Sequence, residues 1–156
     1  MRTIILMVMT ILIMTPGISV AQMHSGGHMM GGQGMMGSSF VRHRFVMRNG
    51  VDPRYASKVN PLRNTPENIQ TGKILYSQNC ASCHGPAGLG NGEAGKSLNP
   101  PPANIAVSSK RRVSTDGYLY WTIAEGGAPL QTAMPPFKNS LKEDEIWKII
   151  LYLRGL

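Results

Sequence analysis

Two cysteines and a histidine stand together in the run Cys80-Ala-Ser-Cys83-His84, and the chain of 156 residues has no other cysteine. Two thiols three positions apart can form a disulfide, act as a redox pair, bind a metal ion or attach to a cofactor. The imidazole that follows at once adds a metal ligand. These three residues are therefore the first candidates for chemistry.

The Cys-x-x-Cys-His spacing favours covalent haem attachment, because two such thiols can form thioethers with the two vinyl groups of one porphyrin. The adjacent His84 then reaches the iron from one face. A thioredoxin-like redox pair should open a helix after a strand, whereas this motif closes a predicted helix. A zinc site needs a second pair of ligands, and no further cysteine supplies one.

Three helices, over residues 65–79, 114–125 and 140–155, are predicted to position this motif. Each range opens on a hydroxyl side chain that can cap a helix: Thr65, Ser114 or Thr115, and Ser140. In the last range Glu143 would complete a capping box with Ser140. Between them runs a loop rich in glycine and proline, and no segment shows the alternation of a strand. The predicted fold class is all-α.

Gly72 and Tyr76 lie one turn apart on the first predicted helix. The glycine allows a second helix to approach closely, and the tyrosine can pack beside an aromatic or aliphatic residue of the last helix: Trp147, Ile149 or Tyr152. We therefore expect the first and last helices to cross at these two positions.

Residues 65–156 resemble a class I cytochrome c, and within that class the single-haem domains related to the cbb3-oxidase cytochrome subunits. The resemblance depends on the CASCHG run, Gly88-Leu-Gly-Asn-Gly92, the three prolines at 100–102, Ala-Met134-Pro-Pro-Phe137, and a last helix with Trp147 and Tyr152. It implies the cytochrome c fold, with about three main helices and long loops wrapped around one covalent haem c.

The resemblance implies Met134 as the sixth ligand of the haem iron, opposite His84. It is the only methionine after the cysteine motif, and Pro135 and Pro136 stiffen the loop that follows. A core methionine that fills a gap is the structural alternative. The family also uses a proline carbonyl near the haem as acceptor for the free N–H of the ligating histidine, for which Pro102 or a neighbour is the candidate.

A haem with both axial positions filled exchanges electrons and binds small molecules poorly. The predicted protein is thus an electron-transfer protein without catalytic residues, a free carrier or a subunit of a respiratory or dehydrogenase complex. One alternative is a haem enzyme in which Met134 is displaced and the sixth position is exchangeable.

Residues 1–21 predict a signal peptide: Arg2 precedes an apolar run, and Ser19-Val-Ala21 fits cleavage after about Ala21. We therefore expect a periplasmic protein.

Residues 22–39 predict a flexible tail rich in glycine, methionine and histidine. Thioether and imidazole groups suit copper, so copper handling is a second alternative function. A low-complexity spacer without a ligand is the competing interpretation of this tail. The candidate ligands are Met23, His24, His28, Met29, Met30, Met35 and Met36.

Residues 40–64 predict a basic, extended arm on or near the domain, in a chain whose formal net charge is +8. With Lys110, Arg111 and Arg112 this arm could dock a redox partner that has an acidic face; a solvated surface is the alternative. Because the protein is expected to be exported, we predict no nucleic-acid partner. We expect the protein to associate with a membrane only through a partner complex.

The run Gly90-Asn-Gly-Glu-Ala-Gly-Lys-Ser97 matches the phosphate-binding P-loop pattern, which needs a strand before it and a helix after it. Here the cysteine motif precedes the run, and three prolines follow it and prevent a helix. No nucleotide binding is predicted.

Overall fold

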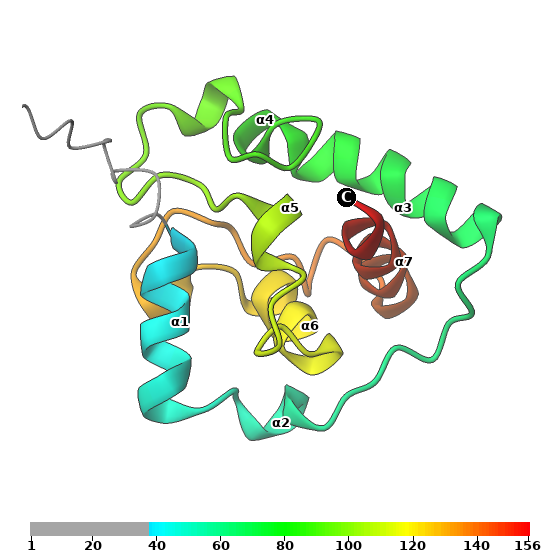
Figure 1. Ribbon diagram of the computed structural model, residues 1–156, viewed down its shortest axis with the longest axis horizontal. Coiled ribbons are helices and arrows are strands. Elements are labelled where there is room, and N and C mark those ends of the chain that lie inside the picture. The colour runs from blue at the N-terminus through cyan, green and yellow to red at the C-terminus, as the bar shows by residue number, and fades with distance from the viewer. Residues whose placement is uncertain (1–37) are drawn as a thin grey trace, which may run out of the picture. The chain divides into compact units, whose positions relative to one another are not determined.

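The computed structural model describes residues 38–156, all of whose regular elements are helical (Figure 1). The longer helices are α1 (Ser38–Asn49), α3 (Pro66–Asn79), α6 (Asp116–Glu125) and α7 (Glu143–Gly155). The shorter ones are α2 (Pro53–Ala56), α4 (Ala81–His84), η2 (Glu93–Gly95), α5 (Ile105–Ser108) and η3 (Ala128–Leu130). The predicted all-α fold class is confirmed. The predicted signal peptide and residues 22–37 of the predicted tail lie outside the described residues.

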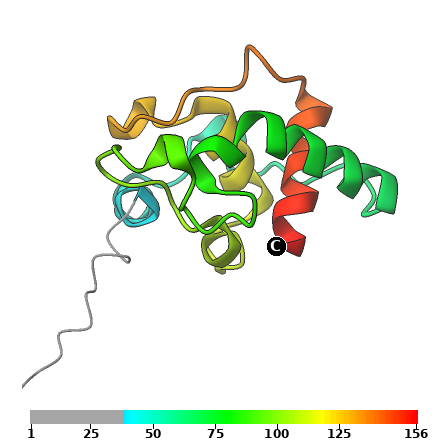
Figure 2. The ribbon, with the colours of Figure 1, turned by 90° about the horizontal axis from the view of Figure 1, so that it is seen from above.

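Helices α3 and α7 cross as predicted (Figure 2). Gly72 lies at the crossing, where a Cβ atom would overlap the backbone carbonyl oxygen of Lys148. Tyr76, on the next turn, is 1% exposed and packs on Tyr152, with ring centroids 5.3 Å apart. This crossing anchors the end of α3, from which the cysteine motif follows directly.

Local capping explains where the helices begin. The hydroxyl oxygens of Thr65 and Thr115 each accept a hydrogen bond from the N–H three residues on, as expected for N-caps. The prediction that Ser140 opens the last helix is wrong, because α7 begins at Glu143. There the backbone N–H of Lys142 donates to the Glu145 carboxylate at 2.7 Å. Acidic residues throughout this first turn stabilise the positive end of the helix.

Helix α6 is apolar around most of its circumference, which explains its place at the centre of the fold. Tyr120 packs on Trp147 of α7, with ring centroids 4.5 Å apart. On another side Tyr118, Leu119 and Ile123 line a cavity. The helix therefore supports both the core and the candidate site.

The expectation of an extended arm over residues 40–64 is wrong for its first part, which forms helix α1. Val46 of this helix is buried in the core, and Phe45 stacks on Trp121 at 5.9 Å between ring centroids. With Arg42, these residues repeat at the three- and four-residue spacing of one helix face. Because an arginine occupies that face, the apolar periodicity was too weak to predict the helix.

The second part of the arm is also tied to the domain. The Tyr55 hydroxyl donates to the Glu125 carboxylate at 2.6 Å, which joins α2 to α6. Beyond α2 the chain is irregular, and the Asn60 side chain donates to the Trp147 carbonyl oxygen at 3.0 Å. Residues 57–64 therefore form no regular element and lie against the helical core.

No helix in the described range, residues 38–156, is long and apolar enough to cross a membrane.

Candidate functional site

The motif Cys80, Cys83 and His84 occupies a single helical turn: Cys80 follows the last residue of α3, and α4 begins at Ala81. Tyr76 holds both ends of this turn. Its backbone carbonyl accepts from the Cys80 N–H at 2.8 Å, and its hydroxyl donates to the Gly85 carbonyl oxygen at 2.7 Å. A residue predicted only for the core therefore also positions the motif.

The glycine-rich run after the motif packs directly against it. A Cβ atom on Gly92 would overlap the carbonyl oxygen of Ser82, so a glycine is needed there. Gly90 has a φ of +79°, and a Cβ there would lie 2.6 Å from the Pro102 carbonyl oxygen. The turn η2 lies within the P-loop-like run, and no strand precedes that run among residues 38–89. These glycines serve close backbone packing.

His84 is oriented by the loop that contains the three prolines. Its Nδ1 lies 3.0 Å from the carbonyl oxygen of Ala103, a distance at which an Nδ1–H donates to that oxygen. Burial lowers the pKa of His84, so the imidazole is held in the neutral form that binds metals. The prediction named Pro102 or a neighbour as acceptor; Ala103 is the neighbour, while Pro102 lines the cavity.

Met134 lies in the loop between η3 and α7, and this loop is pinned to the end of α6. The Gly127 N–H donates to the Met134 carbonyl oxygen at 2.7 Å, and the Phe137 N–H donates to the Ile123 carbonyl oxygen at 3.1 Å. The backbone at residue 134 is therefore held at a defined position beside α6.

One cavity of about 230 Å³ brings the predicted residues together. Cys80, Cys83, His84, Met134 and Pro102 all line it. The rest of the wall is mostly apolar, with Leu98, Ile105, Leu119, Ile123 and Leu153 among its residues. A single water needs only about 10–15 Å³ on this measure, so the cavity suits a much larger, apolar group.

The residues of this cavity fit a haem. Two free thiols and two groups able to bind iron, an imidazole and a thioether, line one apolar space, which is the donor set of His/Met haem. Burial raises the pKa of the Cys80 thiol to about 12. Within the described part of the chain, no group of three histidine, cysteine or acidic residues is placed to hold a metal ion.

Arg42 also lines this cavity, and sequence reasoning missed it. The predicted docking arm over residues 40–64 includes Arg42, yet this side chain is only 6% exposed. Its Nη2 donates to the Gly126 carbonyl oxygen at 2.7 Å, across 84 positions of sequence. The only feature of the sequence that could have predicted its burial is its spacing to Phe45 and Val46, which puts the three residues on one helix face.

The family described as "Cytochrome C oxidase, cbb3-type, subunit III" matches residues 67–153, a stretch that contains the cysteine motif, His84 and Met134. The chain belongs to this family. The cbb3-type domain is thus a cytochrome c-type electron-carrying domain, and haem c is the cofactor that such domains bind.

Relatives of this cbb3-type domain occur in different settings. It is 31% identical over 93 residues to the quinohemoprotein alcohol dehydrogenase ADH IIB of Pseudomonas putida, covering 60% of this chain but 12% of that protein. It is 30% identical to cytochrome c6 of Anabaena variabilis, covering 54% of this chain and 86% of that protein.

Among solved structures, the reducing HAO-like protein complex of Kuenenia stuttgartiensis is similar, with a TM-score of 0.53 and 27% identity. That similarity covers 61% of this chain and 46% of the other chain. The similarity therefore spans most of one small relative but less than half of the length of the other two.

Proposed function

We propose that this chain is an exported, periplasmic mono-haem c-type cytochrome that passes single electrons between redox proteins. It acts as a free carrier or as a subunit of a respiratory or dehydrogenase complex. The observation that carries the proposal is that Cys80, Cys83, His84 and Met134 line one cavity. The chain has a single Cys-x-x-Cys-His motif, which supports one haem, and residues 1–21 have the pattern of a signal peptide.

Each residue of the site has a defined role in this proposal. Cys80 and Cys83 would anchor the haem by thioethers, and His84 and Met134 would bind its iron. When bound, the haem supplies reversible one-electron chemistry at its iron. The Ala103 carbonyl turns the imidazole of His84 so that Nε2 is left for the cavity. The apolar wall keeps water from the site, and no acid or base is required.

The relatives support redox protein partners. One is a quinohemoprotein dehydrogenase and another belongs to a reducing protein complex. Exposed basic residues in this chain, including Arg44, Arg48, Lys110 and Arg112, favour a partner with an acidic face. Association with a membrane would then occur through that partner.

The test is the visible spectrum of full-length protein produced with the c-haem maturation machinery, oxidised and reduced, with and without carbon monoxide. We expect one covalent haem, a low-spin spectrum with a sulfur–iron charge-transfer band, and no change with carbon monoxide. A high-spin or carbon monoxide-binding haem would instead favour the alternative of a haem enzyme. No covalent haem at all would overturn the proposal.

A second candidate function, copper handling, is favoured by the composition of the segment before α1. Two histidines and five methionines lie within residues 22–37: Met23, His24, His28, Met29, Met30, Met35 and Met36. Soft sulfur ligands select Cu(I). The test is titration with Cu(I) of the mature protein and of a version that starts at Ser38. Equal uptake by both would eliminate copper binding by this segment.

A further inference from the structure

Arg42 combines burial, charge and an incomplete set of hydrogen bonds. Its guanidinium lies over the Trp121 ring, with 4.8 Å between Cζ and the ring centroid. Nη2 donates to the Gly126 carbonyl oxygen, whereas Nη1 is buried and has no hydrogen-bond partner. Residues of the described part of the chain therefore satisfy only one side of the guanidinium.

The charge of Arg42 is likewise not balanced by the protein. No carboxylate among residues 38–156 forms an ion pair with it. Burial lowers its pKa to about 10, which reflects the cost of a charge removed from water. A buried guanidinium without a counter-charge is destabilising, so a natural partner for Nη1 is an anion.

The cavity itself indicates which anion this is. Arg42 is the only arginine, lysine, aspartate or glutamate among the described residues that line it. The haem c bound by this family is an apolar ring that carries two propionate carboxylates. The ring suits the apolar wall, but a carboxylate in the same space needs a cation or several hydrogen-bond donors.

We propose that Arg42 binds a haem propionate through Nη1 while Nη2 remains on the Gly126 carbonyl. This inference depends on the haem site proposed above and adds a residue to it. Residue 42 lies on α1, outside the family match over residues 67–153. Through it, α1 becomes part of the haem environment and controls the ionisation of the propionate.

A pH titration of the reduction potential tests this role. An ionised propionate stabilises the oxidised iron, so the potential falls as pH rises through the propionate pKa. Beside Arg42 that pKa should be low, and the wild-type potential should be flat near neutral pH. In Arg42→Met the propionate pKa should rise by about 1–3 units, which moves the fall in potential toward neutral pH.

The ionisable protein groups near Arg42 are present in the wild type, in Arg42→Met and in the control alike, and they include His43, whose Nδ1 is also buried without a partner. Tyr118 of α6 is the titratable group that faces Arg42, and Arg111 in turn faces Tyr118. Burial raises the pKa of Tyr118 above its ordinary 10, so it keeps its proton throughout the titration. Arg44→Met is the matched control, since Arg44 lies on the same helix and is exposed. It should keep the wild-type profile.

A wild-type profile in haem-loaded Arg42→Met would overturn the proposal and leave Arg42 as a structural contact of Gly126 and Trp121. If that variant does not fold, NMR spectroscopy of the reduced wild-type protein tests the contact between Arg42 and the propionate instead. A nuclear Overhauser effect between the Arg42 guanidinium and propionate methylene protons is expected, and its absence would overturn the contact. Every sample is first checked for covalent haem. A wild-type protein without it contradicts the proposed function rather than this assignment.

Discussion

The backbone of Gly72 in α3 lies directly on the carbonyl group of Lys148 in α7. A Cβ atom at residue 72 would overlap the Lys148 oxygen and lie 2.6 Å from the carbonyl carbon. The neighbouring atoms belong to the backbone of a buried helix, so they cannot move aside as a flexible side chain could. The crossing of the two helices therefore depends on glycine at residue 72.

Gly72→Ala should lower the free energy of unfolding of the haem-loaded protein by about 1–3 kcal/mol, because the helices must separate to admit a methyl group. The better helix propensity of alanine, worth about 1 kcal/mol, offsets only part of this loss. Urea unfolding measures the effect. Gly155→Ala is the control, since a Cβ on Gly155 meets nothing within 4 Å. An equal loss in both variants would contradict the close approach.

Glu125 should make stability depend on pH under acidic conditions. Its side chain is 12% exposed and accepts from Lys138 Nζ at 2.8 Å and from the Tyr55 hydroxyl at 2.6 Å. These contacts hold the pKa of Glu125 below its ordinary 4.5. A lowered pKa in the folded state means stability that is present above pH 4.5 and is lost as pH falls through the folded pKa.

In Glu125→Gln the free energy of unfolding should therefore fall less steeply below pH 4.5 than in the wild type. Urea unfolding from pH 6 down to about pH 3 would show the difference. Glu93→Gln removes a carboxylate that is 86% exposed and pairs only with Lys96, so it should keep the wild-type slope. Identical slopes in all three proteins would rule out this role for Glu125.

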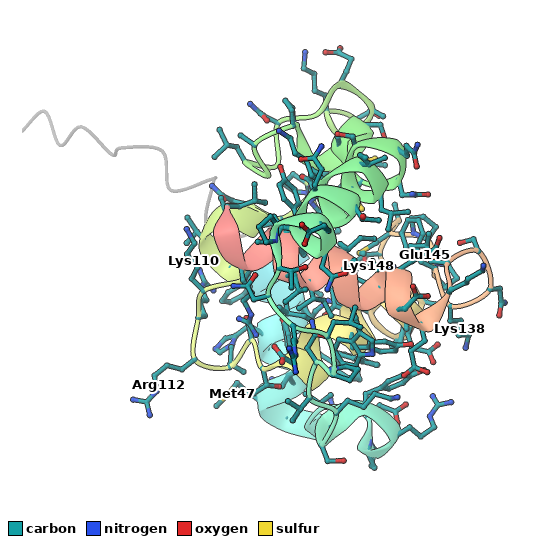
Figure 3. All side chains as sticks on the ribbon, turned by 90° about the vertical axis from the view of Figure 1, so that its right-hand side faces the viewer. Met47, Lys110, Arg112, Lys138, Glu145 and Lys148 are labelled. Carbon is teal, nitrogen blue, oxygen red and sulfur yellow. The ribbon has the colours of Figure 1, made fainter. Side chains whose placement is uncertain are left out.

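Met134→Ala should open the sixth position of the haem iron. The expected result is loss of the sulfur–iron charge-transfer band, a lower reduction potential and new binding of carbon monoxide. The control is Met47→Ala, since Met47 is 69% exposed and projects from α1 (Figure 3). It should leave all three properties unchanged. A Met134→Ala protein that keeps the wild-type spectrum would eliminate this residue as a ligand.

Electron exchange with a small acidic redox protein should slow as salt rises, because screening weakens electrostatic steering. Lys110 and Arg112 are exposed, and Arg112 extends away from the ribbon in Figure 3. Neither residue forms an ion pair within residues 38–156. K110Q/R112Q should lower the second-order rate constant at low salt. K58Q/K148Q removes the same charge from lysines already paired with acids and should have a smaller effect.

If K58Q/K148Q lowered the rate constant more than K110Q/R112Q, the docking surface would lie elsewhere on the domain. A rate constant that does not change with salt would count against electrostatic docking altogether.

Much of the fold could be predicted because its signals are local. Thr65 and Thr115 cap α3 and α6 through hydrogen bonds to residues only three positions away. The crossing at Gly72 and Tyr76 could be predicted because a glycine and an aromatic on successive turns suit a close helix contact. Helix α1 could not, because its stability comes from packing on Trp121, a residue far away in sequence.

Which groups could hold a cofactor follows from the primary structure, since the spacing of Cys80, Cys83 and His84 belongs to one helical turn. What surrounds them depends on the packing of distant segments. That packing brings Met134 to the same cavity, makes Ala103 rather than Pro102 the acceptor for His84, and buries Arg42 against a carbonyl 84 positions away. Burial and the pairing of buried charges depend on contacts between distant segments, and no local pattern specifies such contacts.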